Sequence, residues 1–190
     1  NMKIGLGISA RHVHLTREAI DILFGKDYQL TKLKDLKQLG QYAANEKVEV
    51  AGPRDSFKTV RILGPERSKN QVELSVSDCI KIGVKPVVKD SGDHEGSYGA
   101  KIIGPQGEIT IEKGVIVASR HVHISTITAQ KEGIKNGDIL KATVPGDREV
   151  VFGNILARVD DSFVDELHLD TDEANASLAY DGQEIELSYV

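Results

Sequence analysis

The chain has 190 residues, of which 24 are Lys or Arg and 29 are Asp or Glu, so its formal net charge is −5. This negative balance, with few aromatic residues, excludes the basic and aromatic surface typical of nucleic-acid-binding proteins. No apolar run approaches the roughly 20 residues that cross a bilayer. The single cysteine, Cys79, excludes an internal disulfide and is expected to be a buried apolar side chain. We therefore expect a globular protein with no nucleic-acid or membrane partner.

Short strands separated by turns dominate the expected secondary structure. Apolar and polar residues alternate with a period of two, as in Val48 and Val50 against Lys47 and Glu49. This period is typical of a half-buried strand. Glycine and proline turns separate the expected strands, which in chain order are 5–13, 47–53, 57–65, 71–78, 100–105, 108–114, 114–119, 139–147 and 183–190. The pattern predicts a mainly β protein.

Four short helices are expected among these strands: 17–25, 30–40, 127–133 and one that follows Thr171. Hydroxyl side chains that can act as N-caps precede three of them: Thr16, Ser125 or Thr126, and Thr171. The segment 30–40 has the most amphipathic pattern, because Leu33, Leu36 and Leu39 recur at helical spacing.

The tetrapeptide Arg-His-Val-His occurs twice, beginning at Arg11 and at Arg120, and each copy leads into an expected helix. This repetition indicates an internal duplication. The two copies contain four of the six histidines: His12, His14, His121 and His123. In an extended strand, residues i and i+2 lie on one face about 6.6 Å apart. Both histidines of a copy can therefore reach one metal ion at about 2.1 Å, and the pattern predicts metal binding.

Further ligands decide whether the histidine pairs hold one ion or two. His168 lies between Leu167 and Leu169 in an expected strand, so it faces the opposite side from these leucines. Glu73 has a similar position in the segment 71–78. The residues alone leave both arrangements open. The sixth histidine, His94, is expected to be a loop residue.

Arginine is the other residue type that suggests chemistry. Arg11 and Arg120 precede the histidine pairs, and Arg67 lies in an expected turn. A guanidinium group binds phosphate with a planar fork that lysine lacks, so arginines near metal ions suggest an anionic substrate. The glycine-rich loop that begins with Ser91 and Gly92 could also offer donors to an anion.

Taken together, these segments resemble the PduL-type phosphotransacylases, also called phosphate propanoyltransferases. The segments that carry the resemblance are SARHVHL, LGPERSKNQVELS, SGDHEGSYG, GVIVASRHVHIS and ELHLDTDEANA, and they span nearly the whole chain. The resemblance implies a reversible reaction of an acyl-CoA with phosphate to give an acyl phosphate and CoA. Tyr98 departs from the proline expected in this family, and the choice between propanoyl and acetyl groups stays open.

The resemblance also implies a fold. It is a mainly β architecture of two small, internally duplicated β-barrels with a few short capping helices. The first barrel would comprise residues 1–10 and 119–190, and the second residues 11–118 with a helical insert. We further expect a homodimer, located in the bacterial cytoplasm or, if a targeting segment precedes this sequence, in the lumen of a microcompartment.

By resemblance, the active site uses two divalent metal ions, most simply Zn²⁺, with coenzyme A as substrate or product. The implied ligands of one ion are His12, His14 and Glu73, and those of the other are His121, His123 and His168. Arg67 would position the substrate, and Arg11, Arg120, Ser91 and Gly92 are further candidates for substrate binding. The alternatives are a metal-dependent hydrolase and a non-catalytic metal-binding protein.

Overall fold

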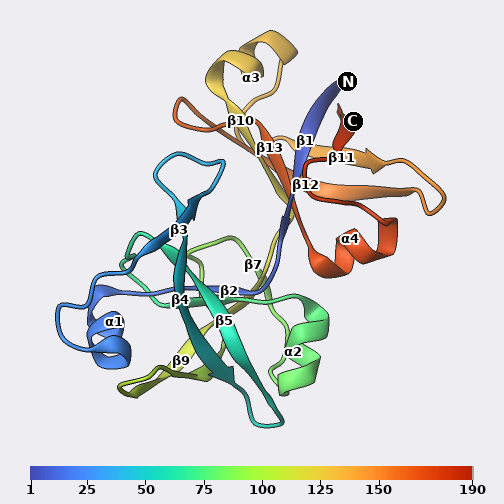
Figure 1. The fold of residues 1–190 in the computed structure, drawn as a ribbon. Coiled ribbons are helices and arrows are strands. Elements are labelled where there is room, and N and C mark those ends of the chain that lie inside the picture. Colours follow the sequence, from blue (N-terminus) through green and yellow to red (C-terminus); the bar gives the residue numbers. More distant parts are fainter. Residues whose placement is uncertain (190) are drawn as a thin grey trace. The chain divides into compact units, whose positions relative to one another are not determined.

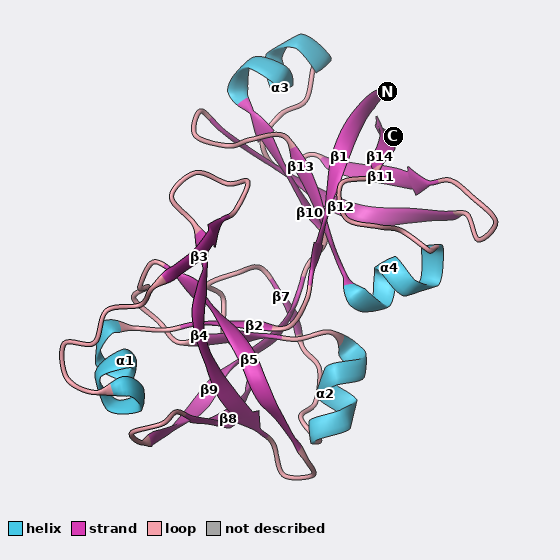
Figure 2. Cartoon of the chain, viewed as in Figure 1, coloured by secondary structure: helices cyan, strands magenta, loops and turns pink. Residues whose placement is uncertain are grey.

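The computed structural model describes residues 1–189 and confirms a mainly β protein with a few short helices (Figures 1 and 2). The chain divides into two compact units. Unit 1 contains residues 1–10 and the chain from Ser119 onward, and unit 2 contains residues 11–118. Each unit has a separate apolar core, so each is described in turn.

Unit 2 is a closed six-stranded barrel with two helices. The pairings run β4–β5–β2–β6–β9–β8 and return to β4. The strands are β2 (His12–His14), β4 (Tyr42–Ala51), β5 (Ser56–Gly64), β6 (Gln71–Glu73), β8 (Tyr98–Ile103) and β9 (Glu108–Ala118). Two short strands pair outside this ring, β3 (Lys32–Asp35) with β4 and β7 (Val88–Lys89) with β9. The helices are α1 (Arg17–Phe24) and α2 (Val76–Ile82).

Unit 1 is a closed barrel in the order β1–β13–β10–β12–β11–β14. Its strands are β1 (Met2–Ser9), β10 (His121–Ser125), β11 (Ile139–Val144), β12 (Val150–Asp160), β13 (Glu166–Asp170) and β14 (Glu184–Tyr189). Its helices are α3 (Thr126–Glu132) and α4 (Thr171–Ser177). None of the helices in residues 1–189 is both long enough and apolar enough to span a membrane.

The two barrels have the same topology, which confirms the predicted duplication. In unit 2, β2 pairs parallel with β5 and antiparallel with β6, and in unit 1, β10 pairs in the same senses with β12 and β13. The strand that precedes each histidine strand belongs to the other barrel. β1 precedes β2 but pairs with β13 and β14, whereas β9 precedes β10 but pairs with β6 and β8.

The capping side chains define where the helices begin. Thr16 caps α1 by accepting a hydrogen bond from Ala19 N, and Ser125 caps α3 from Thr128 N, which confirms both predictions. For α4 the prediction of Thr171 is wrong by one residue. Asp170 is the N-cap, because its carboxylate and the Glu173 side chain form a reciprocal capping box.

Two predicted elements differ in the structure. The segment 30–40 is not a helix: it contains strand β3, and two of its leucines are exposed, Leu33 at 50% and Leu39 at 74%. Because this segment does not pack these leucines against a core, their helical spacing does not stabilise a helix. Pairing of β3 with β4 supplies the backbone hydrogen bonds instead. The strand predicted over 71–78 ends at Glu73, because Ser75 accepts a hydrogen bond from Asp78 N and starts α2.

The central valine of each histidine strand anchors that strand in its core. Val13 belongs to the core of unit 2 and Val122 to that of unit 1, and both are 0% exposed. Because side chains alternate along a strand, the histidines on either side of each valine point to the opposite face. Burial of the valines therefore fixes the direction of both histidine pairs.

Candidate metal and anion sites

Three histidines of unit 1 form a compact group. Strand β10 supplies His121 and His123, and β13 supplies His168, which lies opposite His121 in the antiparallel register. One potential ligand atom from each imidazole lies within 4.8 Å of the others. Within residues 1–189, these three histidines are the group of side chains that lies close enough together to hold a metal ion.

Hydrogen bonds determine which nitrogens of this group face one another. His121 Nδ1 lies 2.9 Å from the Ser119 carbonyl oxygen, and His168 Nε2 lies 2.6 Å from Glu166 Oε1. A carbonyl or carboxylate oxygen accepts, so these two nitrogens are the donors. In the neutral imidazoles the other nitrogens, His121 Nε2 and His168 Nδ1, are acceptors, and they face each other at 3.4 Å. Two lone pairs at this distance fit a shared cation.

His123 completes the group. Its Nδ1 is buried and has no hydrogen-bond partner among residues 1–189. Burial is the largest of the causes that lower the pKa of His123 to about 3. The imidazole is therefore neutral near pH 7 and retains a lone pair for a cation.

The corresponding side chains of unit 2 are a pair of histidines and a neighbouring glutamate. His12 and His14 are buried, and their ring centroids lie 5.0 Å apart. Glu73 lies opposite His12 in the β2–β6 register, with its Oε2 3.3 Å from His12 Nε2. Burial, followed by the charges of His12 and Arg67, lowers the pKa of His14 to about 2. His14 is therefore also neutral near pH 7.

Arg67 lies beside the glycine-rich loop of the same unit. Its backbone N–H donates to the Leu15 carbonyl at 2.9 Å, and its Nη1 donates to Ser91 Oγ at 3.0 Å. The Gly92 N–H is directed inward and donates to the side chain of Gln71 at 2.8 Å. The structure thus brings Arg67 and Ser91 together, and it uses the Gly92 amide to hold the loop.

Arg11 and Arg120, predicted as substrate contacts, have equivalent partners in their own units. Arg11 pairs with Asp78 in α2, and its guanidinium lies 4.1 Å from the Phe57 ring centroid. Arg120 pairs with Glu173 in α4 and lies 5.0 Å from the ring of Phe152. Both acidic residues occupy the third position of their helices, three residues after the N-cap. Each arginine therefore links the start of a histidine strand to the helix that follows the antiparallel neighbour of that strand, α2 after β6 and α4 after β13.

Two residues that the sequence prediction missed support these groups. Gln71 and Glu166 lie two residues before Glu73 and His168, and they are opposite His14 and His123 in the registers. The period of two could have identified both, because residues i and i−2 of a strand share a face.

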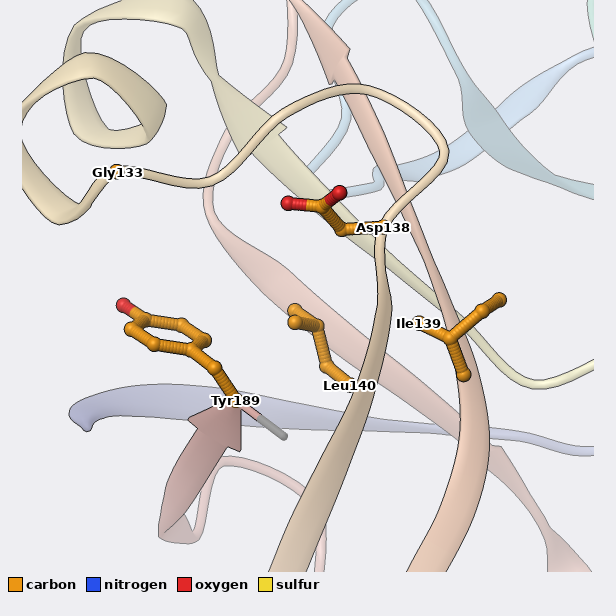
Figure 3. Close-up of a pocket in the computed structure, with 5 residues that line it drawn as sticks. All are labelled: Gly133, Asp138, Ile139, Leu140 and Tyr189. Carbon is orange, nitrogen blue, oxygen red and sulfur yellow. The ribbon is translucent and has the colours of Figure 1, made fainter.

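A pocket of about 290 Å³ in unit 1 contains none of the predicted site residues (Figure 3). It is lined by Gly133, Asp138, Ile139, Leu140 and Tyr189. Its polar groups have local partners: Asp138 Oδ2 accepts from Lys135 N at 2.8 Å, and the Tyr189 hydroxyl lies 3.4 Å from Glu132. We assign no function to this pocket.

Comparison with known proteins identifies the family. The phosphate propanoyltransferase family model matches residues 5–180. A phosphate propanoyltransferase of Thermotoga maritima is 49% identical over 93% of this chain and 85% of its own length. Similar relatives carry the same name in Lachnoclostridium phytofermentans (48% identity, 95% of this chain, 84% of the relative) and Clostridioides difficile (48%, 88%, 80%). These similarities place the chain among the acyltransferases. It belongs to the phosphate propanoyltransferase family, which confirms the resemblance noted in the sequence.

Proposed function

We propose that this protein interconverts a short-chain acyl-CoA and phosphate with an acyl phosphate and CoA. Propanoyl-CoA is the first candidate, because the relatives are named as propanoyltransferases, and acetyl-CoA is the second. The single observation that carries the proposal is the group of His121, His123 and His168, in which two acceptor nitrogens face each other at 3.4 Å.

We also propose that the protein holds two divalent metal ions, most simply Zn²⁺. The unit 1 histidines fit such an ion, because a cation would satisfy the two facing acceptors, and His123 offers a third nitrogen within 4.8 Å of the ligand atoms of the other two. The duplication supports a second ion in unit 2. There Glu73 occupies the register position that His168 has in unit 1, opposite the first histidine of its pair. The proposed ligands are His12, His14 and Glu73 for one ion, and His121, His123 and His168 for the other.

The side chains have distinct tasks in this proposal. The two ligand groups would hold the ions, and each ion, when bound, would supply positive charge to stabilise a thiolate and offset the charge of phosphate. Ser119 and Glu166 hold the imidazoles of His121 and His168 so that their acceptor nitrogens face each other. Arg67 binds phosphate through its planar donor fork and orients it.

The reaction balances without an acylated side chain. A phosphate oxygen forms a bond to the thioester carbonyl carbon, and the carbon–sulfur bond breaks. Its electron pair leaves with the sulfur, which becomes the CoA thiol after taking up a proton. Cys79 is 0% exposed within the core of unit 2, so it is not placed to attack a substrate. We therefore propose direct attack by phosphate.

A thiol-release assay with propanoyl-CoA and acetyl-CoA tests this function. Metal-loaded and chelated protein are compared, each with and without phosphate. We expect release only when both metal and phosphate are present. Release without phosphate would instead indicate a metal-dependent hydrolase. Stoichiometric metal without any release would indicate a non-catalytic metal-binding protein.

A further inference from the structure

A buried glutamine organises the loop next to Arg67. Gln71 lies in β6 opposite His14 and is 1% exposed. Burial of an amide costs free energy unless its donors and acceptor form hydrogen bonds. All three hydrogen bonds that we observe for this amide run to the loop residues Ser91, Gly92 and His94. One side chain of the barrel thus fixes the loop.

The backbone of the loop determines the orientation of this amide. The Gly92 N–H can only donate, and it lies 2.8 Å from Gln71 Oε1. The oxygen therefore faces Gly92, and the Nε2 group faces Ser91, to whose Oγ it donates at 3.1 Å. His94 Nε2 lies 3.0 Å from the same oxygen and is also a donor. With this arrangement Gln71 Nε2 cannot accept a proton from Ser91.

The Ser91 hydroxyl can consequently donate its proton in a hydrogen bond to a ligand. It accepts two hydrogen bonds, one from Gln71 Nε2 at 3.1 Å and one from Arg67 Nη1 at 3.0 Å. A hydroxyl has two acceptor positions and one donor, so only the donor is left for a ligand. Ser91 and its neighbour Gly92 are exposed to solvent, so a ligand can reach them. Arg67 and Ser91 together present donors of the kind that an anion needs.

We propose that Gln71 is a positioning residue for the phosphate substrate. By donating to Ser91, it holds the hydroxyl beside Arg67 with its proton directed to the anion. This inference rests on the proposed function, because phosphate is the anion that the proposed reaction uses. Gln71 itself does not touch the substrate.

The substitution Gln71→Glu tests this role with almost no change in shape. A glutamate can still accept from Gly92 and His94, but its second oxygen accepts from Ser91 instead of donating, and an ionised glutamate would repel phosphate. We expect the KM for phosphate to rise about tenfold or more, since a hydrogen bond to a charged group is lost. The KM for propanoyl-CoA should change by less than about twofold. Gln38→Glu, at another buried glutamine of unit 2, is the matched control and should leave both constants unchanged.

A double-mutant cycle with Ser91→Ala separates positioning from a general structural effect. If Gln71 acts through Ser91, Gln71→Glu should raise the KM for phosphate less in the Ser91→Ala protein than in the wild type, because only the charge repulsion then remains. Fully additive effects would overturn the proposed role. If the Gln71→Glu protein does not fold, Gln71→Met, which removes the donor without adding a charge, replaces it in the same cycle.

The outcomes distinguish this inference from the proposed function. A wild-type protein with no phosphate-dependent thiol release would contradict the function, whatever the variants do. A wild type that uses phosphate normally, combined with an unchanged KM for phosphate in the Gln71→Glu protein, would overturn the positioning role alone.

Discussion

Removal of the buried imidazole of His14 should make unit 2 less sensitive to acid. Burial, together with the charges of His12 and Arg67, lowers the pKa of His14 from 6.5 to about 2. The unfolded chain binds a proton at His14 as the pH falls below 6.5, whereas the folded chain does so only near pH 2. The free energy of unfolding therefore decreases as the pH is lowered from about 6.5 towards 2.

The size of this effect follows from the linkage between protonation and folding. Between pH 7.5 and pH 5, a histidine that titrates only in the unfolded chain lowers the free energy of unfolding by about 2 kcal/mol. This value does not depend on how far below pH 5 the folded-state pKa lies. His14→Gln removes the titrating group. In the presence of a chelator, the free energy of unfolding of the variant should therefore decrease by about 2 kcal/mol less than that of the wild type over this pH range.

Hydrogen exchange measured by mass spectrometry in peptides of β4 and β5 can report this difference, because both strands belong to the unit that holds His14. His123→Gln is the matched control. The pKa of His123 is also lowered, to about 3, but this residue lies in unit 1, so the peptides of unit 2 should keep the wild-type pH dependence. Identical pH dependence in the wild type and the His14→Gln protein would refute the reasoning.

Three further substitutions test other parts of the site. Glu166→Gln should lower zinc affinity about 10- to 100-fold, because it weakens the hydrogen bond that orients His168, and competition with a chromophoric chelator measures this. Arg67→Lys should raise the KM for phosphate about tenfold in initial-rate assays, because lysine lacks the planar fork. Cys79→Ala should lower the free energy of unfolding in urea by about 1–2 kcal/mol, yet leave kcat unchanged.

A specific result would contradict each of these three predictions. Unchanged zinc affinity in the Glu166→Gln protein would mean that the carboxylate does not support the ligand, and Glu186→Gln, at an exposed acid of the same unit, controls for net charge. An unchanged KM for phosphate in the Arg67→Lys protein would remove Arg67 from the anion site. Loss of turnover in a folded Cys79→Ala protein would contradict direct attack by phosphate.

The sequence predicted the parts of the fold that depend on neighbouring residues. Alternation along strands, the caps Thr16 and Ser125 and the duplicated histidine motif all act within a few positions, and the structure confirms them. The exchange of β1 and β9 between barrels depends on pairing between distant segments, and only the family resemblance implied it. Helix α2 was missed because the alternation at 71–74 continues into Val76, where Ser75 already starts a helix.

The candidate site was also predicted only where the signal lies within a short stretch of sequence. The histidines were predicted because they repeat, and the structure gathers His121, His123 and His168 as one group. Gln71 and Glu166 were missed, because a single glutamine or glutamate in a strand usually faces solvent. The importance of Gln71 depends on distant partners such as Ser91, which lies 20 residues away along the chain.

The most direct test of the central claim is to identify the product. Metal-loaded protein is incubated with propanoyl-CoA and inorganic phosphate, and the reaction is followed by ³¹P nuclear magnetic resonance. The account predicts a new acyl phosphate resonance that grows in step with free thiol and is absent from chelated protein. Thiol release with no acyl phosphate at any time would contradict the account and would leave the duplicated histidine sites with a hydrolytic function.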